Sequence, residues 1–76
     1  MFINNKYTKW YYGIIEKARS RNLLHGIEKH HIIPRELGGS DDPKNIVNLT
    51  YYEHALCHVL LTKMLTGNNK YKMVSF

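Results

Sequence analysis

Apolar side chains in the first part of the chain recur at helical spacing. Between residues 8 and 21 they return every three or four positions, as on one face of an α-helix. The residues of this stripe are Trp10, Ile14 and Ala18, with Tyr11 and Ile15 beside them. Thr8 can serve as the N-cap, and residues 22–26, which end in glycine, break the pattern. We therefore expect an N-terminal helix over residues 8–21.

Two short β-prone runs follow this helix. Residues 27–33 contain three isoleucines and stop at Pro34, which cannot extend a strand ladder and biases the residue before it toward extended backbone. Residues 46–49 form the second run. The residues between them, 34–44, are mostly turn formers such as glycine, aspartate, serine and proline. The pattern predicts a β-hairpin whose two strands are joined by a long loop.

A second helix is expected to begin at Tyr51. Thr50 and Glu53 have the spacing of a capping box, in which each side chain accepts a hydrogen bond from the backbone amide of the other residue. The expected apolar stripe of this helix includes Ala55, Val59 and Leu60. Because Gly67 is a natural stop, the two strands and this helix should cover about residues 27–66. The predicted fold class is α+β.

Four of the five histidines fall in this strand, loop, strand and helix unit. His30 and His31 are adjacent, so on a strand they point to opposite faces. His54 and His58 are four positions apart, so on a helix they share one face. One strand and one helix can thus bring three imidazoles to a common point and leave the fourth aimed elsewhere. The arrangement predicts a metal site with a spare base beside it.

These histidines and one asparagine follow the order HH, then Asn, then HxxxH, within EKHHIIPRELGGSDDPKNIVNLTYYEHALCHVLLTKM. This order resembles the HNH endonuclease family, especially its phage-encoded homing-type members, and the layout is also similar to the nuclease domains of DNase colicins. The resemblance implies the ββα-metal (His-Me finger) fold, in which a two-stranded hairpin with a long loop and a helix surround one metal ion. It also implies DNA cleavage that leaves 5′-phosphate and 3′-hydroxyl ends.

The resemblance implies a role for each matched residue. His30 matches the first metal ligand, while His54 and His58 match the helix positions that supply the remaining ligands. His31 matches the general base that activates water. Asn45 matches the central asparagine, which orients the base and holds the loop.

The metal and the asparagine each have alternatives. The family often has Asp where His30 stands, and three imidazoles suit Zn, Ni, Co or Mn better than Mg, which prefers oxygen ligands. We expect one divalent ion, which is Zn, Mn, Ni, Co or Mg, and no organic cofactor. Asn48 is a second candidate for the role of Asn45. We prefer Asn45 because its fourteen-residue spacing from His31 is close to the colicin-like one.

Other polar residues of the motif region have ordinary explanations. Asp41 and Asp42 are expected to be turn residues rather than ligands. Glu28 has no assigned role. Cys57 is expected to face the core as a small apolar residue.

The length of the chain limits the number of domains it can form. At 76 residues with 43% hydrophobic content, it is expected to be a single domain, 1–76, at a size where a metal ion often helps to stabilise the core. Its lone cysteine cannot form an internal disulfide, which fits the cytoplasm, that of the host cell if the protein is phage-encoded. We expect no membrane partner. The segment 67–76 is short, so a C-terminal DNA-recognition region is either missing or not needed.

The charge of the chain favours a polyanionic partner. A formal net charge of +5 and a pI near 9.5 indicate DNA, since lysine and arginine near phosphates gain from counterion release. A merely solvated basic face is the alternative. The expected DNA-contacting residues are Lys9, Lys17, Arg19, Arg21, Arg35 and Lys63, and Lys70 and Lys72 add charge. Because none of these belongs to a recognisable base-reading element, little sequence preference is expected.

Two functions remain open from the sequence. The first is a metal-dependent DNA endonuclease with His31 as the base. The second is a non-catalytic zinc-stabilised module that binds nucleic acid or protein. His31 discriminates between them, because a structural zinc site has no use for an unliganded imidazole next to a ligand.

Overall fold

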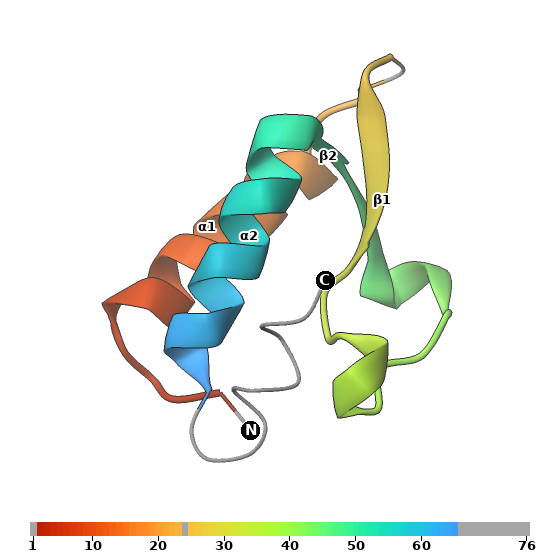
Figure 1. Ribbon diagram of the computed structural model, residues 1–76. Coiled ribbons are helices and arrows are strands. Elements are labelled where there is room, and N and C mark those ends of the chain that lie inside the picture. The colour runs from red at the N-terminus through yellow and green to blue at the C-terminus, as the bar shows by residue number, and fades with distance from the viewer. Residues whose placement is uncertain (1, 24, 66–76) are drawn as a thin grey trace.

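The computed structural model describes residues 2–23 and 25–65 of the chain. The expectations for residues 66–76, including Gly67, Lys70 and Lys72, lie outside the described residues. The elements in chain order are α1 (Lys6–Arg19), β1 (Ile27–His31), the 3-10 turns η1 (Arg35–Leu37) and η2 (Pro43–Asn45), β2 (Ile46–Thr50) and α2 (Tyr51–Met64). The two helices lie side by side, and the hairpin of β1 and β2 packs against them (Figure 1). The predicted α+β class and its hairpin-plus-helix arrangement are confirmed.

Helix α1 begins two residues earlier than the sequence predicted. Its N-cap is Asn5, whose side-chain oxygen accepts a hydrogen bond from the amide of Thr8 at 3.0 Å. Asn5 also donates to the carbonyl of Lys63 at 3.2 Å, which links the start of α1 to the end of α2. The prediction of Thr8 as the N-cap is therefore wrong, because asparagine caps a helix better than threonine and here has a second partner.

The buried face of α1 is rotated by about one residue from the predicted stripe. Tyr11, Ile15 and Ala18 are buried, whereas Trp10 is 56% exposed. Trp10 makes an edge contact with the ring of Tyr7 on the surface. Apolar rings occur on several faces of this helix, so hydrophobicity alone did not determine which face is buried. The polar contacts of Tyr11, described below, favour its place in the interior.

The hairpin has the predicted order, but its first strand is shorter. Strands β1 and β2 are antiparallel, with His30 opposite Val47 and His31 opposite Ile46. The strand ends at His31, and residues 32–33 already belong to the loop. His30 is buried and His31 is half-buried, as expected for neighbours on opposite faces of a strand.

Helix α2 begins at Tyr51, as predicted from its capping box. The hydroxyl of Thr50 accepts from the Glu53 amide at 3.1 Å, and the Glu53 carboxylate accepts from the Thr50 amide at 2.9 Å. The helix ends at Met64, where Leu65 is already extended. The predicted stripe was only partly right: Leu60 is buried, but Ala55 and Val59 are exposed. The buried residues of α2 are Cys57, Leu60, Leu61 and Met64.

An ion pair joins the segment just after α1 to the first turn of α2. Both terminal nitrogens of Arg21 donate to the two carboxylate oxygens of Glu53, one of them at 2.8 Å. The Arg21 guanidinium, followed by the backbone amide of Thr50, holds the pKa of Glu53 near 2, although partial burial acts against this. Arg21 was predicted to contact DNA, but its charge is already neutralised within the fold.

One apolar core lies between the two helices and the hairpin. Its members include Tyr11, Ile15, Leu49, Cys57, Leu61 and Met64, all fully buried. Cys57 faces this core, as expected, and burial raises the pKa of its thiol to about 12. Over the described residues, no helix has both the length and the apolar content needed to cross a bilayer.

Candidate metal centre

Three of the four motif histidines converge at the edge of the core. His30 comes from β1, and His54 and His58 come from successive turns of α2; one nitrogen of each lies within 4.8 Å of the others. The Nε2 atoms of His54 and His58 are 3.2 Å apart. Two nitrogens bound to one zinc ion at tetrahedral angles would be about 3.3 Å apart. The donor set therefore fits a nitrogen-preferring divalent ion.

Tyr11 determines which nitrogen of His30 faces the cluster. The Tyr11 hydroxyl donates to the carbonyl of Ile32 at 2.7 Å, so its oxygen is free to accept from Nε2 of His30, also at 2.7 Å. This hydrogen-bond pattern assigns the proton of His30 to Nε2 and leaves Nδ1 as the atom that can bind a metal. From the sequence, Tyr11 was expected only beside the apolar stripe of the first helix.

Glu28 does the same for His54. Its carboxylate lies 2.8 Å from Nδ1 of His54 and can only accept, so Nδ1 carries the proton and Nε2 faces His58. Sequence reasoning assigned Glu28 no role. A signal was present, since residues two apart on a strand lie on the same face and Glu28 precedes His30 by two.

Burial favours the neutral form of two of these histidines. Burial, followed by the neighbouring His54 and His58, lowers the pKa of His30 to about 3. Burial also lowers the pKa of His58, with His54 adding to the effect. A histidine must be neutral to bind a metal. The cluster is therefore ready to accept a cation at neutral pH without first losing a proton from His30.

The cluster opens into a hollow of about 220 Å³ at the surface. Its lining residues are Lys29, His30, His31, Pro34, Arg35, Glu36, His54 and His58. Both cations of this lining, Lys29 and Arg35, are beside the histidines. The hollow can therefore place an anionic group next to the cluster. Lys29 was not among the predicted DNA-contacting residues.

His31 lies apart from the other three histidines. It lines the same hollow, but its Nε2 is 2.8 Å from a carboxylate oxygen of Asp41. It also lines a second hollow with Lys29, Asp41, Pro43 and Ile46. The structure thus brings three imidazoles together and separates the fourth, although the chemical roles assigned to them stay predictions.

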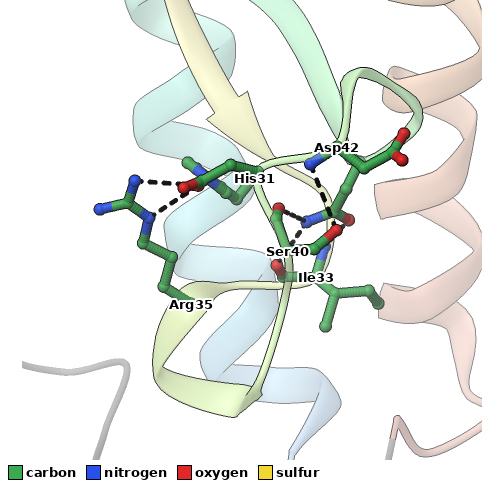
Figure 2. A network of polar contacts seen from close by, with 7 residues as sticks. His31, Ile33, Arg35, Ser40 and Asp42 are labelled. Atoms are coloured by element: carbon green, nitrogen blue, oxygen red, sulfur yellow. Dashed lines mark hydrogen bonds and ion pairs between the residues drawn. The ribbon is translucent and has the colours of Figure 1, made fainter.

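Asn45 holds the loop between the strands, but none of its hydrogen bonds within the described residues goes to His31. Its side chain accepts from the Ile33 amide at 2.8 Å and donates to the carbonyls of Ile33 and Ser40 at 3.0 and 2.8 Å (Figure 2). The contact that we expected between Asn45 and His31 is absent from the described residues. The carboxylate of Asp41 occupies that place instead. Asn48, the second candidate, lies opposite Lys29 in the hairpin.

The remaining basic residues are distributed over the surface. Lys9 and Lys17 flank Trp10 on α1, Arg19 pairs with Glu16 at 2.8 Å, and Lys63 lies over the ring of Tyr7. Of the six predicted DNA-contacting residues, only Arg35 lines the hollow at the cluster. A phosphate at the cluster would therefore meet Arg35 before it met the charges of α1.

Comparison with known proteins agrees with this geometry. The family model described as HNH endonuclease matches residues 18–63. "Probable mobile endonuclease E" of Enterobacteria phage T4 is 48% identical over 59 residues, which are 76% of this chain and 42% of that protein. "Probable mobile endonuclease C" of the same phage is 43% identical over 65 residues, 80% of this chain and 31% of that protein.

The chain is much shorter than the curated relatives it matches. It spans 42% of the first and 31% of the second, and 24% of "Probable mobile endonuclease D" of the same phage, to which it is 46% identical over 63 residues. No solved structure matches the chain. The family match covers more than half of the residues and includes both strands, α2 up to Lys63 and all four motif histidines. The chain therefore belongs to the HNH endonuclease family.

Proposed function

We propose that this chain is the catalytic domain of a metal-dependent DNA endonuclease. In this proposal His30, His54 and His58 hold one divalent ion, and His31 is the general base. The observation that carries the proposal is the division of four histidines around one hollow. Three imidazoles converge, and the fourth lines the same hollow with its Nε2 hydrogen-bonded to Asp41.

The hydrolysis proceeds with few groups. His31 takes a proton from a water molecule at its unprotonated nitrogen, and the water oxygen forms a bond to phosphorus. The bond from phosphorus to the 3′-oxygen breaks, and this oxygen takes a proton from solvent. The bound ion would supply Lewis-acid stabilisation of the negative charge. Lys29 and Arg35 bind the phosphate from the walls of the hollow.

The nature of the ligands supports a particular group of metals. The three converging donors are all imidazole nitrogens, so we propose Zn, Mn, Ni or Co ahead of Mg. The proposed substrate is DNA, which membership of the HNH endonuclease family favours. Those relatives are encoded by a phage, which supports the host cytoplasm as the compartment. Sequence specificity would come from segments outside this chain.

The proposal is tested by plasmid cleavage. The protein is treated with EDTA, and Mg, Mn, Ni, Co and Zn are restored one at a time while calorimetry measures whether each ion binds. We expect cleavage with at least one ion, its loss in His31→Ala, and no loss in the control His25→Ala, which changes a histidine outside the cluster. Tight binding of an ion with no cleavage by the wild type would instead support the non-catalytic zinc module.

A further inference from the structure

A carboxylate from the loop between the strands contacts the isolated histidine. Oδ1 of Asp41 lies 2.8 Å from Nε2 of His31. A carboxylate can only accept at this distance, so Nε2 carries the proton. The other ring nitrogen, Nδ1, is then unprotonated and is the basic atom of His31.

The loop is built so that Asp41 stays in this position. Two residues before Asp41, the Gly39 amide donates to the carbonyl of Pro34 at 2.9 Å, and a Cβ at this glycine would collide with the backbone oxygen of Ile33. Directly before Asp41, the side chain of Asn45 donates to the carbonyl of Ser40. The backbone just before Asp41 is therefore fixed by contacts that do not involve Asp41 itself.

The loop continues with a local cap directly after Asp41. The Asp42 carboxylate accepts from the Lys44 amide at 2.8 Å, and the Asp42 amide donates to the Ser40 hydroxyl at 3.3 Å. Asp42 thus has the turn role that the sequence predicted for both aspartates. Asp41 does not share it, because its oxygen is bonded to side chains.

The same oxygen of Asp41 also holds Arg35. Nε and Nη2 of Arg35 lie 3.0 and 2.9 Å from Oδ1. Hydrogen bonds from His31 and Arg35, in that order, hold the pKa of Asp41 below its ordinary value. One charged oxygen therefore connects the imidazole at the hollow with a guanidinium that lines the same hollow.

We propose that Asp41 is a positioning residue, which holds His31 in the tautomer and orientation that present Nδ1 to the reacting water. The inference rests on the proposed nuclease function for its catalytic consequence. Asp41 acts through His31 and does not touch the substrate. Loss of such an orienting carboxylate typically costs about 10- to 100-fold in activity. The cost should fall on kcat, because ground-state binding of DNA depends on the cations instead.

The chain offers a matched pair of variants for the test. Asp41→Asn replaces the carboxylate by an amide that can donate as well as accept, which permits the other tautomer of His31. Asp42→Asn makes the same chemical change one residue away, and the new side-chain oxygen can still accept from the Lys44 amide. Asp41→Glu keeps the negative charge but places it on a side chain that is one methylene longer.

The first readout is independent of cleavage. Protein with ¹⁵N-labelled histidine is loaded with zinc and studied by long-range ¹H–¹⁵N NMR at a pH where His31 is neutral. In the wild type and in Asp42→Asn, we expect His31 to be protonated at Nε2. In Asp41→Asn, we expect the ring to populate both tautomers. An unchanged His31 tautomer in Asp41→Asn would overturn the inference.

The second readout is cleavage kinetics with an active ion. We expect Asp41→Asn to lower kcat about 10- to 100-fold with KM nearly unchanged, Asp41→Glu to recover part of the loss, and Asp42→Asn to match the wild type. Full kcat in Asp41→Asn would overturn the inference. If the wild type itself cleaves no DNA with any ion, the proposed function fails, and the NMR comparison still decides whether Asp41 fixes the tautomer of His31.

Discussion

Removing the hydroxyl of Tyr11 tests directly whether the fold orients His30 for the proposed metal site. Tyr11 is fully buried and His30 is 2% exposed, so water cannot replace the hydroxyl in Tyr11→Phe. The substitution leaves Nε2 of His30 and the carbonyl of Ile32 without this partner. A buried polar group without a hydrogen bond costs about 1–3 kcal/mol. Tyr11→Phe leaves two such groups, but it also removes one buried hydroxyl, which offsets part of the cost. The free energy of unfolding should therefore fall by about 2–4 kcal/mol.

This loss is large for a chain of this length. A domain of 76 residues has a free energy of unfolding of about 4–11 kcal/mol, and a loss of this size should make the metal-free variant unfold about 12–25 °C below the wild type. Zinc affinity should also fall about 10- to 100-fold, because nothing then determines which nitrogen of His30 faces the cluster. Thermal unfolding in EDTA measures the first effect, and calorimetry measures the second.

Tyr12→Phe is the matched control. Tyr12 is next to Tyr11, its ring packs edge-on against the ring of Tyr11, and its hydroxyl has no hydrogen bond within the described residues. We expect Tyr12→Phe to change neither stability nor zinc affinity by a comparable amount. The reasoning would be refuted if Tyr11→Phe behaved like Tyr12→Phe in both measurements.

Three other predictions follow from the same contacts. His58→Ala should weaken metal binding tenfold or more, and unchanged calorimetry would remove His58 from the site. The pKa of Glu53 is lowered from 4.5 to about 2, so its ion pair stabilises the fold above pH 4.5 and this contribution is lost as the pH falls toward 2. The difference in unfolding free energy between the wild type and Glu53→Gln should therefore shrink over that pH range in an acid titration. DNA affinity should fall steeply with salt, and sequenced cleavage ends should show little base preference; a defined recognition site would reveal a missed base-reading surface.

The sequence predicted those features that depend on local pattern. The two strands, the start of α2 and the separation of His31 from the other histidines follow from spacings of one, two and four residues. The capping box of Thr50 and Glu53 was predicted for the same reason. Each of these signals is complete within a few neighbouring positions, so no knowledge of the path of the chain was needed.

The orientation of the helices could not be predicted in the same way. Helix α1 has aromatic residues on several faces, so its apolar pattern is compatible with burying either Trp10 or Tyr11. The difference lies in a hydroxyl that finds both His30 and the carbonyl of Ile32 inside the fold. Neither partner is near Tyr11 in the sequence. For α2, the core face follows Cys57, Leu60 and Leu61, which leaves Val59 on the outside.

The partners of the histidines were missed because they come from distant positions. Glu28 reaches His54 across 26 residues, and Asp41 reaches His31 only because the loop returns past the end of β1. An exposed aspartate in a turn-forming run has an ordinary explanation as a turn residue. Nothing in the sequence separates Asp41 from Asp42, although one holds an imidazole and the other caps a backbone amide.

These partners show how closely the candidate site depends on the whole fold. His30 is held from α1 by Tyr11, and His54 on α2 is held from β1 by Glu28. The family match begins at residue 18 and so leaves Tyr11 outside it. Yet α1 does more than cover the core, since one of its buried side chains assigns the tautomer of His30. A metal ion bound to the three histidines, as proposed, would connect β1 with α2, and its affinity would in turn depend on α1. Binding of such an ion and stability of the fold would therefore be coupled in this domain.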